Sequence, residues 1–241
     1  EIGDFAIASF DACGIPHDFV ITGRVPNMDM DRMVADVKKI CEAQIAFFEP
    51  KTRKAPMDRY VFMTMVVGEG YGGLEHRAST ALICNRNDIP VKHNPEMSEG
   101  YKAFLGLCSH EYFHTWNVKR IKPAVFADYD LRQESYTSLL WLFEGFTSYY
   151  DDLMLLRAGV IDSGAYLKLI EKTHETMEGW YSPLSRQALA VIGPYSAKIE
   201  SSERTAFKIC RDLFYLEFKE FPGFFDKDGE RAKTFLPNNV R

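Results

Sequence analysis

Residues 109–123 read S-H-E-Y-F-H-T-W-N-V-K-R-I-K-P, and this stretch decides the fold. It contains the pattern H-E-x-x-H, beginning at His110, inside a segment that we predict to be helical. The four-residue spacing places His110 and His114 on one helix face, so both imidazoles can reach one metal ion. Glu111 lies beside them, where it can accept a proton from a metal-bound water without being a ligand itself. The alternative is a chance match on a helix that bears two histidines.

A catalytic zinc site needs a third protein ligand and an open coordination position. Residues 140–153 read L-W-L-F-E-G-F-T-S-Y-Y-D-D-L, with Glu144 in an otherwise apolar part of a predicted helix. We expect this carboxylate to be buried, and for a buried carboxylate a metal ion is a favourable partner. The alternative is a Glu paired with a buried Arg or Lys. Ser148, one turn later, would face the same way and could hydrogen-bond a ligand.

A glycine pair precedes a carboxylate in the segment Gly72-Gly73-Leu74-Glu75-His76. Strands are predicted at 59–67 and 74–84, and we expect them to form a hairpin that leaves the second strand near a sheet edge. Paired glycines let backbone approach a ligand closely, and an edge strand can bind an extended peptide through its main chain. Glu75 would then meet the positive amino terminus of that peptide. The alternative is a plain β-turn followed by a solvated Glu.

The rest of the sequence alternates between strand-like and helix-like segments. Residues 2–24 indicate two short strands around a turn at Gly14–Pro16. Helices are predicted at five places: 29–48, 98–116, 135–158, 163–176 and 201–218. The predicted fold class is α+β, with a small mixed sheet that has an edge strand and a mainly helical part. The tail from about residue 177 is poorly legible.

The composition excludes several classes of protein. The 241 residues are 46% hydrophobic and 26% charged, which is ordinary for a globular domain. The net charge of −5 argues against nucleic acid as a partner, and no apolar stretch is long enough for a membrane span. The five scattered cysteines fit free thiols in a reducing compartment, which favours the cytoplasm. A secretory signal upstream of Glu1 could be missing from this sequence, so localisation stays open, as does the oligomeric state.

Together these motifs resemble the glycyl aminopeptidase family, relatives of aminopeptidase N among the gluzincin metallopeptidases. The resemblance runs from about residue 2 to residue 175. It covers G-Y-G-G-L-E-H-R-A-S-T at residues 70–80 and the two stretches at 109–123 and 140–153, in the family's order. It implies a thermolysin-like zincin catalytic domain at residues 25–241, with residues 1–24 as the end of an upstream β domain or its junction.

The resemblance also implies roles for individual residues. The implied ligands of a Zn²⁺ ion are His110, His114 and Glu144, and the implied general base is Glu111. The segment that holds Gly72, Gly73 and Glu75 takes the place of the family's exopeptidase motif, whose carboxylate binds the α-amine of the substrate. Family members also carry a downstream Tyr in a Y-x-x-G context that stabilises the oxyanion. The sequence departs from this pattern, because Gly does not follow at the third position after Tyr181, Tyr195 or Tyr215.

We therefore predict a zinc metallo-aminopeptidase that hydrolyses peptide bonds at a free N-terminus. A small first residue, Gly or Ala, is the preference that the family implies. The predicted partner is a peptide substrate with a free amino terminus. Two alternatives stay open: a zinc endopeptidase, and an inactive zinc-bound module that only binds peptides, which the missing tyrosine motif keeps in view.

Overall fold

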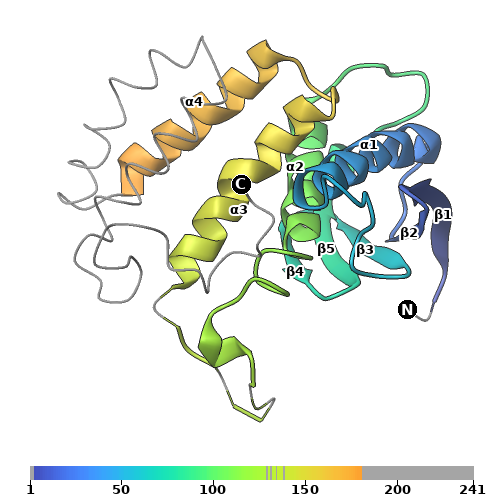
Figure 1. Ribbon diagram of the computed structural model, residues 1–241. Coiled ribbons are helices and arrows are strands. Elements are labelled where there is room, and N and C mark those ends of the chain that lie inside the picture. Colours follow the sequence, from blue (N-terminus) through green and yellow to red (C-terminus); the bar gives the residue numbers. More distant parts are fainter. Residues whose placement is uncertain (1–2, 129, 131, 134, 138, 181–241) are drawn as a thin grey trace. The chain divides into compact units, whose positions relative to one another are not determined.

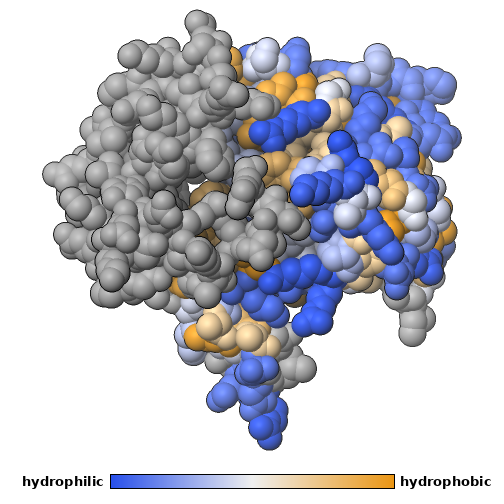
Figure 2. Space-filling view, in the orientation of Figure 1, coloured by the Kyte–Doolittle hydropathy of each residue, from blue (hydrophilic) through white to orange (hydrophobic). Residues whose placement is uncertain are grey.

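A computed structural model describes residues 3–180 apart from 129, 131, 134 and 138. It divides into two compact units, Glu1–Leu167 and Lys168–Arg241, and the sheet and the candidate site lie in the first. Hydrophilic residues dominate the visible face of the described part, with hydrophobic ones between them (Figure 2). No described helix is long and apolar enough to cross a membrane. The predicted helix at 201–218 lies outside the described residues.

Five strands form one small mixed sheet in the order β1-β2-β3-β5-β4 (Figure 1). The strands are β1 (Phe5–Ala12), β2 (Ile15–Thr22), β3 (Tyr60–Val67), β4 (Gly72–Glu75) and β5 (Ser79–Asn85). β1 and β2 pair antiparallel around the predicted turn, β2–β3 and β3–β5 are parallel, and β4–β5 is antiparallel. Residues 5–22 thus contribute the first two strands of this sheet, with β2 paired directly to β3.

The predicted hairpin between residues 59–67 and 74–84 is wrong in its pairing. β3 pairs in parallel with β5, and a turn at residues 76–78 divides the second predicted strand into β4 and β5. In that turn the His76 amide donates to the carbonyl of Ser79 (2.8 Å). β5 lies inside the sheet and β4 at its edge, because alternate side chains of β5 are buried whereas β4 is short and half exposed. The glycine pair therefore lies on β4, the strand at the sheet edge.

One face of the sheet carries the core. Its buried side chains on the three central strands include Phe19, Ile21, Tyr60, Phe62, Thr64, Val66, Thr80, Leu82 and Cys84. Two helices pack on this face: α1 (Met30–Phe48) and α2 (Glu99–Phe113). The apolar side chains that α1 buries are Met33, Val37, Ile40, Cys41 and Ile45. The Asp29 carboxylate caps its first turn by accepting from the Arg32 amide (3.1 Å).

α2 lies between the sheet and α3 (Leu140–Arg157) (Figure 1), and ten of its fifteen residues are buried. The Ser98 side chain caps α2 by accepting from the Tyr101 amide (3.1 Å). α3 begins at Leu140 rather than at the predicted Ser135, and its N-cap residue, Leu139, has no side-chain capping bond. Gly159 follows its end with a φ of 65°, a left-handed conformation that favours glycine.

The short helices η1 (Arg86–Asp88) and η2 (Ala124–Phe126) lie in connections, and α4 (Ser163–Trp180) extends the predicted 163–176 helix.

A buried hydrogen-bond chain fastens α2 to the sheet. His17 on β2 is fully buried, and its Nδ1 lies 2.8 Å from the Ile15 carbonyl, which can only accept. Nδ1 therefore carries the proton, and the Tyr112 hydroxyl donates to Nε2 (2.9 Å). Burial lowers the pKa of His17, so the ring stays neutral in the folded protein. Because Tyr112 belongs to the H-E-x-x-H segment, this chain fixes that segment against β2.

Candidate metal and peptide site

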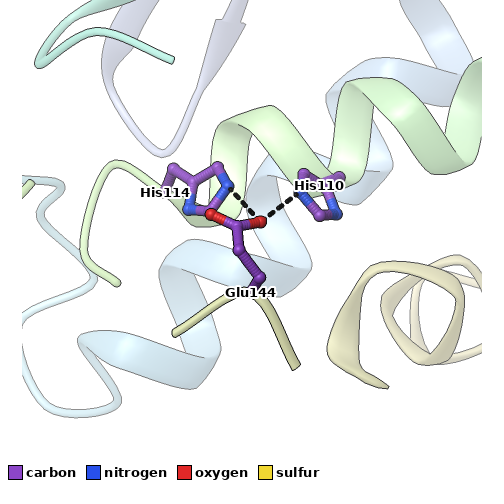
Figure 3. Close-up of side chains that lie close together, drawn as sticks. All are labelled: His110, His114 and Glu144. Carbon is purple, nitrogen blue, oxygen red and sulfur yellow. Dashed lines mark ion pairs between the residues drawn. The ribbon is translucent and has the colours of Figure 1, made fainter. Parts of the chain in front are cut away.

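Three side chains from two helices converge at one point (Figure 3). His110 and His114 project from the end of α2, and Glu144 projects from the first turns of α3. Glu144 Oε2 lies 3.3 Å from His110 Nε2 and 3.6 Å from His114 Nε2. One ligand atom from each of the three lies within 4.8 Å of the other two. The structure thus brings together the three residues that the sequence predicts as metal ligands.

The expectation that Glu144 is buried is wrong. Its side chain is 42% exposed, although its neighbours Leu142 and Phe143 are buried. Leu142 and Phe143 lie on other faces of α3, whereas the carboxylate of Glu144 reaches the two histidines. The neighbouring imidazoles of His110 and His114 lower the pKa of Glu144 to about 2, so the carboxylate is charged.

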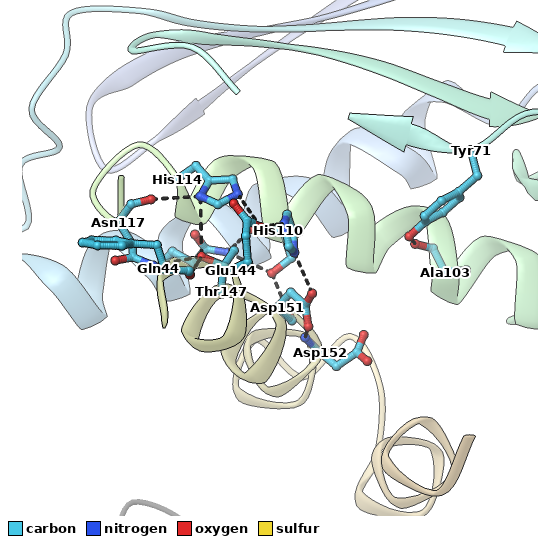
Figure 4. A network of polar contacts seen from close by, with 12 residues as sticks. Gln44, Tyr71, Ala103, His110, His114, Asn117, Glu144, Thr147, Asp151 and Asp152 are labelled. Carbon is cyan, nitrogen blue, oxygen red and sulfur yellow. Dashed lines mark hydrogen bonds and ion pairs between the residues drawn. The ribbon is translucent and has the colours of Figure 1, made fainter. Parts of the chain in front are cut away.

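Outer hydrogen bonds orient both histidines (Figure 4). Nδ1 of His110 donates to Asp151 Oδ2 (3.0 Å), and Nδ1 of His114 donates to the carbonyl of Asn117 (2.9 Å). Both rings therefore turn Nε2 toward Glu144, which is the arrangement found around metal-binding histidines. Burial opposes the charged form of His110, but hydrogen bonds with Asp151 and Glu144 raise its pKa to about 10.

The outer partner on α3 near His114 is Thr147, and the expectation for Ser148 is wrong. Ser148 is exposed, whereas Thr147 is fully buried. Asn117 Nδ2 donates to Thr147 Oγ1 (2.9 Å), which lies 3.5 Å from His114 Nδ1. The sequence analysis also missed Asp151, although a helix places it two turns after Glu144 and on the same face.

Glu111 lies beside the ligand cluster but has a different environment. It is 4% exposed, and its Oε2 has no hydrogen-bond partner among the described residues. Burial raises the pKa of this carboxyl group. A carboxylate that is buried without a partner is costly, so its free oxygen is suited to a ligand or a water molecule.

The edge strand β4 packs against Glu111 through Gly73. A Cβ atom at Gly73 would lie 2.3 Å from Glu111 Oε1, so only glycine fits here without a shift. A Cβ at Gly72 would meet nothing within 4 Å, although its φ of 157° disfavours other residues. Of the two glycines, Gly73 is therefore the one that the close approach requires.

Glu75 projects from β4 toward the same cluster. One of its carboxylate oxygens lies within 4.8 Å of ligand atoms of both Glu111 and His114. Lys119, which the sequence analysis did not single out, places its Nζ 3.0 Å from Glu75 Oε1. Both side chains are partly buried, at 20% exposure for Glu75 and 28% for Lys119. The structure thus brings Glu75 to the metal-ligand cluster.

The tyrosines considered for the oxyanion role lie outside the described residues: Tyr181, Tyr195 and Tyr215. The four cysteines of the described part, Cys13, Cys41, Cys84 and Cys108, are free thiols, and all but Cys13 are buried.

Comparisons with known proteins agree with the motifs. Residues 103–189 match the model of the M61 glycyl aminopeptidase family. A solved structure of an aminopeptidase N family protein from Idiomarina loihiensis is 53% identical, with a TM-score of 0.65. That match covers 69% of this chain and 28% of the Idiomarina protein, so this chain spans about a quarter of that relative's length. No curated protein matches the chain. The family resemblance that the sequence indicates is confirmed.

Proposed function

Because this chain belongs to the glycyl aminopeptidase family, we propose that it is the catalytic part of a zinc-dependent aminopeptidase. The observation that carries the proposal is the convergence of His110, His114 and Glu144 beside a Glu111 oxygen for which the described part of the chain offers no hydrogen-bond partner. The proposed fold is that of a thermolysin-like zincin, in which a mixed sheet borders the cleft through its edge strand.

The residues present fit a zinc ion. Two imidazole nitrogens and one carboxylate oxygen make the donor set of catalytic zinc sites, which keep a fourth position open. The hydrogen bonds that the two Nδ1 atoms donate to Asp151 and to the Asn117 carbonyl hold both Nε2 atoms toward the cluster. When bound, zinc polarises the scissile carbonyl and lowers the pKa of water.

The residues around the zinc would then have separate roles in peptide hydrolysis. Glu111 accepts a proton from the attacking water and passes it to the leaving amine. The exposed edge of β4 pairs with the main chain of an extended peptide. Glu75, on the same strand, binds the α-ammonium group, which places the first peptide bond beside Glu111. The preference for Gly or Ala as first residue comes from the family alone.

The test is a comparison of unblocked and N-acetylated Gly- and Ala-amides as substrates, with zinc content measured on the same preparation. We expect about one zinc per chain and cleavage of the unblocked substrates only. The variant Glu75→Gln tests the proposed amine-binding carboxylate. Its matched control is Glu69→Gln, because Glu69 is an exposed carboxylate on the loop just before β4. Equal cleavage of blocked and free substrates would indicate an endopeptidase. Bound zinc with no cleavage would indicate a module that only binds peptides.

A further inference from the structure

The turn that follows α2 brings a lysine to the proposed amine-binding carboxylate. Lys119 Nζ lies 3.0 Å from Glu75 Oε1, across two segments that are far apart in the sequence. The backbone holds the lysine in place, because the Lys119 amide donates to the carbonyl of His114 (3.1 Å). The Val118 amide closes the turn by donating to the Ile121 carbonyl (2.8 Å).

This turn adopts a conformation that its residues disfavour. Val118 has a φ of 97°, in a region that β-branched residues rarely occupy. Its side chain is buried, and Arg120 ties the turn to the preceding chain by donating to the carbonyls of Thr115 and Pro56. The surrounding contacts therefore impose the strained turn, and strain of this kind is concentrated at functional sites.

The same turn also orients a proposed metal ligand. His114 Nδ1 donates to the carbonyl of Asn117, and Asn117 Nδ2 donates to Thr147 on α3. A single turn thus sets the direction of the His114 ring and the position of the Lys119 ammonium group.

The charges around Glu75 show why it needs a partner. Its carboxylate lies close to that of Glu111, and two like charges repel each other. Without a nearby cation, Glu75 would lower its energy by turning from Glu111 toward solvent. Lys119 opposes this movement by binding Oε1. A carboxylate has about four lone-pair sites on its two oxygens, so Oε2 can still accept a second cation.

We propose that Lys119 is a positioning residue for amine recognition. It fixes Glu75 through Oε1 and leaves Oε2 to accept a hydrogen bond from the substrate's α-ammonium group. This inference rests on the proposed function, since it needs Glu75 to be the amine-binding group. It makes Lys119 a determinant of affinity for free N-termini rather than of the chemical step.

The experiment measures KM and kcat on unblocked Ala-amide for the parent, Lys119→Met and Lys119→Arg. We expect Lys119→Met to raise KM about tenfold, as for loss of a partly buried charge pair, while kcat and zinc content stay near the parent values. Lys119→Arg should restore much of the affinity because it keeps the charge. Lys122→Met, a lysine on the same connection, is the matched control. If Lys119→Met does not fold, Lys119→Gln is the second variant.

Two further measurements separate positioning from a general structural effect. In a Glu75→Gln background, Lys119→Met should cause no further rise in KM, because the group that it positions is gone. In a Glu111→Gln background, which cannot turn over, calorimetry with Ala-amide should show the same loss of affinity. An unchanged or lower KM in Lys119→Met, with parent preference for free amines intact, would overturn this inference alone. A parent protein without that preference would overturn the proposed function as well.

Discussion

Replacing Gly73 with Ala would drive a methyl group into the proposed general base. The Cβ atom would lie 2.3 Å from Glu111 Oε1 and 2.4 Å from its carboxyl carbon, whereas ordinary contacts begin near 3.4 Å. Either β4 or Glu111 must therefore move by about 1 Å, and a shift of that size at a reacting group costs about a hundredfold in rate. We expect kcat/KM on unblocked Ala-amide to fall by about that factor.

The assay for Gly73→Ala needs three readouts: kcat/KM, bound zinc and the thermal midpoint. Zinc content should not change, because the three atoms nearest to the added Cβ all belong to Glu111, which is not a proposed ligand. Gly68→Ala is the control, since a Cβ at Gly68 meets nothing within 4 Å and the residue lies on the exposed turn after β3. Parent-like kcat/KM in Gly73→Ala would refute the reasoning, because it would mean that the place of Glu111 against β4 does not matter for turnover.

The remaining predictions concern four other side chains. Glu111→Gln should keep zinc and lose nearly all turnover, and zinc loss in this variant would make Glu111 a ligand. Glu144→Ala should show the opposite order in metal analysis, with zinc lost first. Glu75→Ala should lower kcat/KM on unblocked peptides by about a hundredfold, with little further loss on acetylated ones. His17 has a folded pKa below its ordinary 6.5, so its contribution to stability is complete above that pH and falls as pH decreases. Thermal midpoints of the zinc-free protein at falling pH should therefore drop more steeply than those of His17→Asn.

The first contacts of the site could be predicted from the sequence because they follow helix periodicity. His110 and His114 share one face by spacing alone, and their convergence with Glu144 agrees with a metal-ligand set. Asp151 obeys the same periodicity relative to Glu144, so it could have been found by extending the helical face for two more turns. The exposure of Glu144 could not be predicted, because the hydrophobicity of its neighbours in the sequence does not tell which face of the helix is left open.

The sheet shows where local patterns stop being informative. Apart from the turn at residues 76–78, both segments predicted as strands are extended. Their pairing depends on how the chain connects them, because two apolar strands joined by glycines look the same in sequence whether they form a hairpin or a parallel pair. In the structure, the burial of alternate residues on β5 agrees with its position between β3 and β4, whereas β4 has a neighbouring strand on one side only.

The turn after α2 explains why Lys119 could not be predicted at all. No sequence rule places a valine at a φ of 97°, so nothing in W-N-V-K-R-I predicts a reversal that points one lysine back to a strand over 40 residues earlier. Backbone preferences alone would predict glycine, rather than valine, at a residue with this positive φ. The turn keeps its conformation at the buried Val118 because its side chains bond to atoms outside it. Arg120 donates to the carbonyls of Thr115 and Pro56, and Asn117 donates to the Phe143 carbonyl on α3. The lysine proposed to position Glu75 is therefore placed by tertiary contacts, whereas the shared face of His110 and His114 follows from the periodicity of one helix.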